Sequence, residues 1–208
     1  MSQTATLTPS TRPGRSAGVL TLLAGAAFVV LPLLVELVSY DLFALMGLAG
    51  VLVLVALPGL RRLQRGADGR AGAWGLRLLL AGLIVLVVLV ASGDPLDAAL
   101  DGTAQAVAEG AFVVLGITSM LALLVGVISF SVGMTRARVF PPAAIWVFLG
   151  GMTLALVSEA FEQSLRGPVP TVADVLPVAG FVVSGLGLLL LGRAALAMGH
   201  GWTPHAVS

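Results

Sequence analysis

The stretch Gly110–Thr135, GAFVVLGITSMLALLVGVISFSVGMT, contains no charged residue and decides the fold. About 20 apolar residues in an α-helix cross the roughly 30 Å hydrocarbon core of a bilayer. Five further charge-free runs have comparable lengths: Ser16–Val35, Leu42–Leu60, Leu78–Gly93, Val139–Ser158 and Val175–Gly192. Continuous apolar runs indicate helices, because strands of a membrane barrel alternate apolar and polar residues. The sequence therefore predicts an all-α, polytopic membrane helical bundle with six transmembrane helices.

The connections between these runs alternate in the sign of their charge. Ten of the eleven arginines and Asp68 fall on one side of the six-helix threading, for a net charge of +9. Nine of the ten acidic residues and Arg166 fall on the other side, for a net charge of −8. Arginine-rich short loops stay on the cytoplasmic side of a membrane. We therefore expect an N-in/C-in protein of a bacterial cytoplasmic membrane, with both termini cytoplasmic.

The predicted organisation has one transmembrane domain between two tails. Residues 1–15 are expected to be a disordered cytoplasmic tail, residues 16–197 the six-helix domain, and residues 198–208 a second cytoplasmic tail. The predicted helices cover about residues 16–38, 42–60, 74–93, 107–134, 141–160 and 174–196. An outer loop over residues 94–106 opens with Asp94-Pro95, a helix-start signal, and is expected to hold a short interfacial helix. Gly66, Gly69, Gly72 and Gly75 predict a flexible linker in the second connection.

Composition narrows the class of function. An apolar fraction of 58% and a mean hydropathy of +1.07 lie outside the range of soluble domains. The chain has no cysteine, which excludes disulfides, thiolate metal sites and cysteine catalysis. It also lacks lysine and asparagine, whose codons are rich in A and T, and this favours a high-GC bacterial genome. Because the arginines lie at helix ends and not on one continuous face, they weigh against a nucleic-acid partner.

Enzyme motifs are missing from the sequence. It contains no His-Glu-x-x-His, no Gly-x-Ser-x-Gly and, without lysine, no phosphate-binding Gly-x-x-x-x-Gly-Lys. The two histidines, His200 and His205, lie in the tail without a third metal ligand. We therefore expect a protein that is not an enzyme and that has no cofactor and no metal site. An intramembrane lipid-processing enzyme has no supporting motif.

Three segments carry a resemblance to a protein group. They are Leu57–Arg62 at the end of the second helix, Gly133–Pro142 between the fourth and fifth, and the glycine-rich Gly180–Arg193 of the last. In these segments the chain resembles the uncharacterised small six-helix integral membrane proteins of high-GC Gram-positive (actinobacterial) type. The likeness spans most of the chain, but it is topological. It implies no activity and no catalytic residue.

Four carboxylates form the candidate ion or proton site. Glu36 continues the first helix, Glu109 enters the fourth from the same side, and Glu159 and Glu162 end the fifth, three residues apart. An ionisable residue at membrane depth is a functional hypothesis by default. If the four converge, they form an outward-facing acidic vestibule that binds a cation through oxygen ligands or relays protons. If they lie among the headgroups, they only enforce orientation.

Other residues are expected to contact lipid or helix neighbours. Arg61, Arg62, Arg65 and Arg77 are the predicted lipid-headgroup contacts, and Trp74 is a predicted interfacial anchor. The hydroxyls of Thr118, Ser119, Ser129, Ser131, Thr153 and Ser184 are expected to bond to backbone carbonyls of their own helices. Small residues four apart, Ala122/Gly126, Gly151/Ala155 and Gly180/Ser184, permit close helix approach. They indicate a homo-oligomer seam or contacts inside one bundle.

Two functions remain open from the sequence. The first is a non-enzymatic accessory or regulatory component that works with another membrane protein, which the short loops and the few polar residues at mid-depth favour. The second is a small cation or proton-coupled transporter that uses Glu36, Glu109, Glu159 and Glu162. In both cases the lipid bilayer is the expected environment.

Overall fold

Six α-helices make up the part of the chain that the computed structural model describes, residues 13–38, 44–64, 66–99, 102–164 and 171–199. They are α1 (Pro13–Leu37), α2 (Ala44–Leu63), α3 (Gly69–Ala99), α4 (Gly102–Ala137), α5 (Pro142–Ser164) and α6 (Thr171–Gly199). These ranges contain no strand. Each helix is long and apolar enough to cross a membrane. The predicted all-α bundle of six membrane-spanning helices is confirmed.

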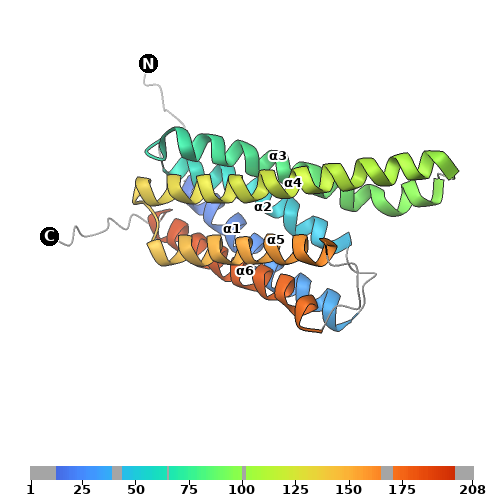
Figure 1. Cartoon of the computed structure of the whole chain (residues 1–208). Coiled ribbons are helices and arrows are strands. Elements are labelled where there is room, and N and C mark those ends of the chain that lie inside the picture. Colours follow the sequence, from blue (N-terminus) through green and yellow to red (C-terminus); the bar gives the residue numbers. More distant parts are fainter. Residues whose placement is uncertain (1–12, 39–43, 65, 100–101, 165–170, 200–208) are drawn as a thin grey trace, which may run out of the picture.

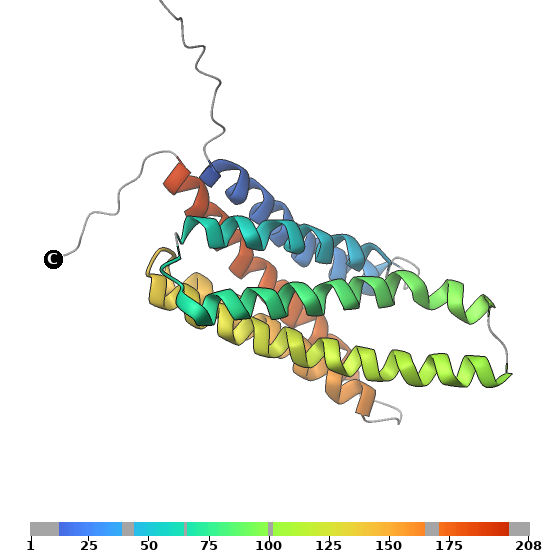
Figure 2. The same ribbon diagram turned by 90° about the horizontal axis from the view of Figure 1, so that it is seen from above.

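The helices form a ring in the order of the sequence (Figures 1 and 2). Each packs against its neighbours in the chain, and α6 closes the ring by packing against α1. Contacts are most extensive for the pairs α1–α6, α3–α4 and α5–α6, and much sparser between α2 and α3 and between α4 and α5. The α3–α4 pair is therefore a hairpin that leans against a group formed by the other four helices.

The two ends of the bundle carry opposite charge. The first residue of α1 and the last of α6 lie at one end, where a Cβ on Gly14 would be 3.1 Å from the Cα of Gly199. We call this the termini end and the opposite one the hairpin end, because α3 ends and α4 begins there (Figure 1). The described arginines lie toward the termini end: Arg15, Arg61, Arg62, Arg70, Arg77, Arg136, Arg138 and Arg193. The acidic positions within the six helices lie toward the hairpin end, whereas Asp68, in the turn before α3, lies toward the termini end.

Glycines bring several helix pairs into close backbone contact. A Cβ on Gly75 of α3 would lie 2.3 Å from the backbone nitrogen of Phe130 in α4, and one on Gly133 would lie 2.5 Å from the Cα of Gly72. In lipid, helix association depends on such packing more than on apolar burial. The prediction that Gly72 and Gly75 belong to a flexible linker is wrong, because α3 begins at Gly69 and the backbone at both residues lies close to α4.

The hairpin end of α3 and α4 is longer than predicted. The expected outer loop over residues 94–106 is wrong, because α3 continues through Asp94 and Pro95 to Ala99 and α4 begins at Gly102. Both views show this hairpin projecting beyond the other four helices (Figures 1 and 2). The appearance of Asp94 and Asp97 in the sequence therefore does not coincide with the end of the helix.

The small residues that the sequence singled out lie between helices of the same chain. A Cβ on Gly151 of α5 would be 2.3 Å from the backbone nitrogen of Ser184 in α6, and one on Gly180 would be 2.4 Å from that of Ala155. Gly126 faces Leu79 in the same manner. These contacts agree with packing inside one bundle. A homo-oligomer remains a prediction.

Hydroxyl groups within the helices bond to their own backbone, as expected for three of the predicted residues. Thr118 donates to the carbonyl of Val114 at 2.7 Å, Ser119 to that of Gly116 at 2.8 Å and Ser184 to that of Gly180 at 2.9 Å. Ser131 differs, because its buried Oγ has no hydrogen-bond partner among the described residues.

Candidate functional site: a cavity in the hairpin half

The interior of the bundle differs between its two halves. Toward the termini end, large side chains fill the space between the helices, and Leu57, Phe130, Ile145, Phe148 and Leu191 are fully buried there. Toward the hairpin end, the sparse contacts of the α3–α4 pair with its neighbours leave the interior incompletely filled. The half of the bundle toward the termini end, whose interior is filled, thus forms the floor of an internal space in the half toward the hairpin end.

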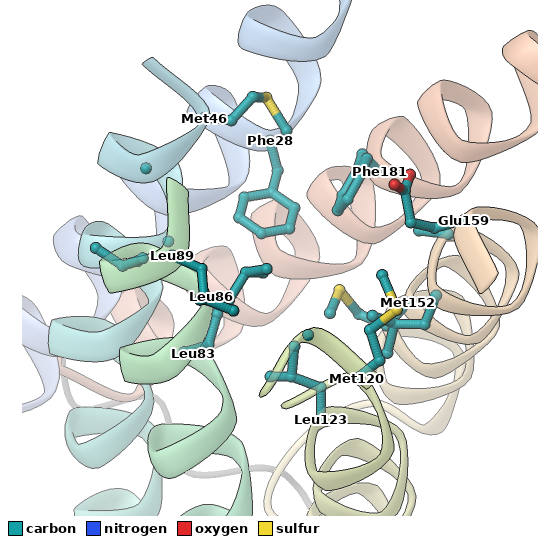
Figure 3. A pocket seen from close by; sticks show the side chains of 16 residues that line it. Phe28, Met46, Leu83, Leu86, Leu89, Met120, Leu123, Met152, Glu159 and Phe181 are labelled. Atoms are coloured by element: carbon teal, nitrogen blue, oxygen red, sulfur yellow. The ribbon is translucent and has the colours of Figure 1, made fainter. Parts of the chain in front are cut away.

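This space is a cavity of about 270 Å³ to which all six helices contribute (Figure 3). The lining residues belong to the middle of α1, the beginning of α2, the later part of α5 and the early part of α6, together with parts of α3 and α4. Two glycines contribute open surface, because a Cβ on Gly47 of α2 or on Gly116 of α4 would meet no other atom within 4 Å. A ligand can therefore approach the backbone at these two positions.

Aromatic and sulfur-containing side chains form much of the wall. Phe28 of α1 and Phe181 of α6 pack edge to face, with ring centroids 5.7 Å apart and an interplanar angle of 72°. Met46, Met120 and Met152 approach from α2, α4 and α5 (Figure 3). Methionine is flexible and polarizable, so it can adjust its shape to a bound molecule. The wall suits an apolar ligand and is able to accommodate it by small side-chain movements.

Glu159 is the one ionisable residue among the described residues that line the cavity. It lies on α5 one turn beyond Ala155 and Leu156, which also line the cavity, and its side chain is half-buried. Phe181 of α6 lines the same cavity (Figure 3). A carboxylate at the edge of an apolar space interacts more strongly with a positive charge than it does in bulk water, because the effective dielectric constant is lower.

The structure places the four predicted carboxylates differently from one another. Glu159 lines the cavity, whereas Glu109 is exposed on α4, seven residues before Gly116 and thus about 10 Å farther along the helix. Glu36 and Glu162 lie within α1 and α5, and their side chains fall outside the described residues. Within the described ranges, no three Asp, Glu or His residues gather as a metal site would require. The four-carboxylate vestibule remains a prediction.

The predicted lipid-contacting arginines also have different surroundings. The Nε of Arg61 donates to the Oδ2 of Asp68 at 2.9 Å, and the Asp68 side chain is fully buried. Arg62 is exposed, and Arg65 falls outside the described residues. Arg77 is exposed and its guanidinium carbon lies 5.2 Å from the ring centroid of Trp74, which is also exposed. The cation–π geometry agrees with an interfacial anchor, while Arg61 has a partner inside the protein.

A buried polar cluster at the α2–α3 turn was missed by the sequence analysis. Next to the Arg61–Asp68 pair in sequence, Gln64 is 1% exposed. The side-chain Nε2 and Oε1 of Gln64 have no hydrogen-bond partner among the described residues, and the same holds for Oδ1 of Asp68. The available signal was Asp68 itself, the single acidic residue in an arginine-rich segment.

The cavity was missed as well, because its lining depends on the order of the helices in space. Three of the six methionines line it, together with Gly47 and Gly50 near the beginning of α2 and Gly116 in the middle of α4, but these residues are scattered from position 46 to 152. No protein-family model, curated protein or solved structure matches the chain. The inference of function therefore depends on the geometry and chemistry of this six-helix membrane protein and of its cavity.

Proposed function

We propose that this protein binds a small apolar cation, such as an organic ammonium compound, in the cavity beside Glu159, and that it catalyses no reaction. The observation that carries the proposal is the combination of an apolar cavity of about 270 Å³ with one carboxylate at its edge. A neutral apolar ligand would not need Glu159. A hydrated metal ion would find few oxygen ligands among the methyl, thioether and phenyl groups of the wall.

The aromatic pair favours a ligand that carries a positive charge. Quaternary ammonium groups bind against aromatic rings through cation–π attraction, in addition to their apolar contacts. Phe28 and Phe181 present their rings to the cavity that Glu159 also lines (Figure 3). A ligand with a cationic group and apolar substituents would contact the carboxylate, the rings and the methionine side chains together.

Orientation gives the proposed site a direction. The arginine-rich termini end is proposed to face the cytoplasm of a bacterial cell, as the positive-inside rule requires. The filled half of the bundle then closes the cavity toward the cytoplasm, and the cavity lies in the outward half. A cation would be collected from the outer side. This arrangement supports the transporter hypothesis for an organic cation. The structure then corresponds to a state of the transporter whose cavity is closed toward the cytoplasm.

The test uses two ligands of the same shape and different charge. Phenyltrimethylammonium is a cation, and tert-butylbenzene is its neutral counterpart in which carbon replaces nitrogen. We expect phenyltrimethylammonium to bind the protein in nanodiscs by equilibrium dialysis, after subtraction of its binding to empty nanodiscs. Glu159→Gln should weaken this binding about tenfold, which corresponds to about 1.4 kcal/mol. The same change at the exposed Glu109 should leave it unaltered.

Filling the cavity provides a second readout. Gly116→Leu places a side chain in open space of the cavity and should abolish binding, while Gly150→Leu places one in open space on the exposed surface of α5 and should not. The thermal unfolding midpoint of the protein is measured with each ligand in turn. If tert-butylbenzene raises this midpoint as much as phenyltrimethylammonium does, both in wild type and in Glu159→Gln, the charge of the ligand has no role and the proposal is contradicted. Equal binding by the Gly116→Leu and Gly150→Leu variants would contradict the site.

The accessory or regulatory role is a second candidate. The projection of the α3–α4 hairpin beyond the other helices favours it, because this part of the protein is available to another membrane component (Figure 1). A stoichiometric protein partner that is retained during purification in mild detergent, together with no binding of phenyltrimethylammonium, would favour this role over cation binding.

A further inference from the structure

A groove on the outside of the bundle runs along α6 between α1 and α5. It has a volume of about 650 Å³ and is lined by Leu22 of α1, Val147 of α5 and a stripe of α6 from Leu186 to Leu196. Volumes of roughly 300–1,000 Å³ are usual for sites of small molecules. The lining is leucine-rich, and among the described residues it contains one charged side chain, that of Arg193.

Glycines explain why α6 lies at the bottom of a groove. On one side, a Cβ on Gly187 would lie 2.4 Å from the backbone nitrogen of Phe148 in α5. On the other side, a Cβ on Gly192 would lie 2.8 Å from the backbone nitrogen of Leu22 in α1. Both neighbours therefore approach the α6 backbone closely and rise on either side of its outward stripe. The floor of the groove is therefore a single stripe of α6 side chains.

The outward stripe of α6 combines apolar surface with one cation. Leu186 and Leu190 are 46% and 45% exposed, and Arg193 follows on the same helix face and is exposed as well. Arg193 lies six residues before Gly199, or about 9 Å from the end of α6. Arg15 of α1 lies beside Gly199 at the end of the bundle, so Arg193 is deeper in the membrane-spanning part. An arginine at this depth is costly unless an anion or the interface receives its charge.

We propose that this groove binds an anionic phospholipid, with its phosphate on the guanidinium of Arg193 and an acyl chain along the α6 leucines. Guanidinium groups bind phosphate in a bidentate manner, which sets a position as well as a charge. The groove runs parallel to the helices, as the chains of a bilayer do, and Arg193 lies in its part toward the termini end, one turn before Leu196. A second helix is a poorer occupant, because a helix with its side chains is about 10–12 Å wide and the groove floor is a single stripe.

The test compares two phospholipids that differ in headgroup charge and share the same acyl chains, phosphatidylglycerol and phosphatidylethanolamine. We expect native mass spectrometry of the full chain, purified in a mixture of both, to show one tightly retained phosphatidylglycerol. Arg193→Gln should lower its occupancy about fivefold, the factor that corresponds to about 1 kcal/mol per charge near an anionic surface. The control Arg136→Gln removes an exposed arginine of α4 outside the groove and should not change the occupancy.

A second pair of variants tests the acyl-chain contact without altering charge. Leu190→Trp fills the groove, whereas Leu121→Trp adds the same side chain to the exposed face of α4. We expect the first to lower phosphatidylglycerol retention and the second to leave it unchanged. Equal retention by wild type and Arg193→Gln would overturn the proposal, and so would equal losses for Arg193→Gln and Arg136→Gln. A dimer that Arg193→Gln dissociates, with no lipid retained by the wild type, would also overturn it.

Discussion

At the scale of single residues, identical amino acids have opposite roles according to what their side-chain positions face. Gly150 and Gly151 are adjacent in α5, and in the sequence only Gly151 belongs to a pair of small residues four apart, with Ala155. A Cβ on Gly150 would meet no atom within 4 Å, whereas one on Gly151 would lie 2.3 Å from a backbone atom of α6. The first glycine only lowers helix propensity, and the second permits two helices to touch.

The Gly150/Gly151 pair gives a prediction of opposite signs. Gly151→Ala should destabilise the bundle by about 1–3 kcal/mol, because overpacking against backbone forces α5 and α6 apart. Gly150→Ala should be neutral or stabilising by up to about 1 kcal/mol, since alanine is the better helix former. Chemical unfolding in mixed micelles, followed by circular dichroism, measures both. Equal effects of the two changes would show that the close α5–α6 contact is not formed.

Asp68 and Arg61 form a pair whose members differ in burial, and this predicts an order of stabilities. Arg61→Ala leaves the fully buried Asp68 carboxylate without its cation and should cost about 3 kcal/mol. Asp68→Asn should cost about 1 kcal/mol, because the side chain of Arg61 is 37% exposed and can turn toward water or headgroups. Adding Asp68→Ala to Arg61→Ala should restore part of the loss in the same unfolding measurement. A larger cost for Asp68→Asn than for Arg61→Ala would contradict the buried pair.

At the scale of helices, small residues repeat every seven positions along the contact faces. On α6, the face toward α5 carries Gly180 and Gly187, and the face toward α1 carries Gly185, Gly192 and Gly199. On α4, the face toward α3 carries Ser119, Gly126 and Gly133. A repeat of seven keeps one face toward a partner when two helices wind around each other. These patterns are present in the sequence. The four-residue pairs that the sequence analysis examined reveal only part of them.

Much of the helix content followed from hydropathy, and the errors share one physical cause. Charge and glycine were interpreted as helix breaks at residues 94–106 and at Gly72 and Gly75, yet α3 is helical at both places. A charged residue in a membrane protein indicates contact with water or headgroups, which a helix can reach without ending. A glycine in an apolar sequence need not belong to a linker, because inside a membrane helix it permits a neighbouring helix to approach closely. Of the candidate site, only Glu159 was identified, because the cavity is created by the order of the six helices in space.

At the scale of the whole molecule, the separation of charge and the separation of packing coincide. The arginine-rich end of the bundle is also the end whose interior is filled, and the acidic end contains the cavity with Glu159. A protein inserted according to its arginines would therefore present its cavity in the half of the membrane away from the cytoplasm. The direction of ligand entry thus depends on the orientation of the chain in the membrane.

Orientation can be measured directly because the chain has no cysteine, so a single introduced thiol is the only target for a maleimide. Ala67 is exposed between α2 and α3 at the termini end, and Ala104 is exposed on α4 near the hairpin turn. We expect a membrane-impermeant maleimide to label Ala104→Cys in intact cells, and Ala67→Cys only after the membrane is made permeable. The reverse pattern would place the arginine-rich end outside and the cavity in the cytoplasmic half. Cation binding at Glu159 could then persist, but the ligand would have to reach the cavity from the cytoplasm, so orientation and site are tested separately.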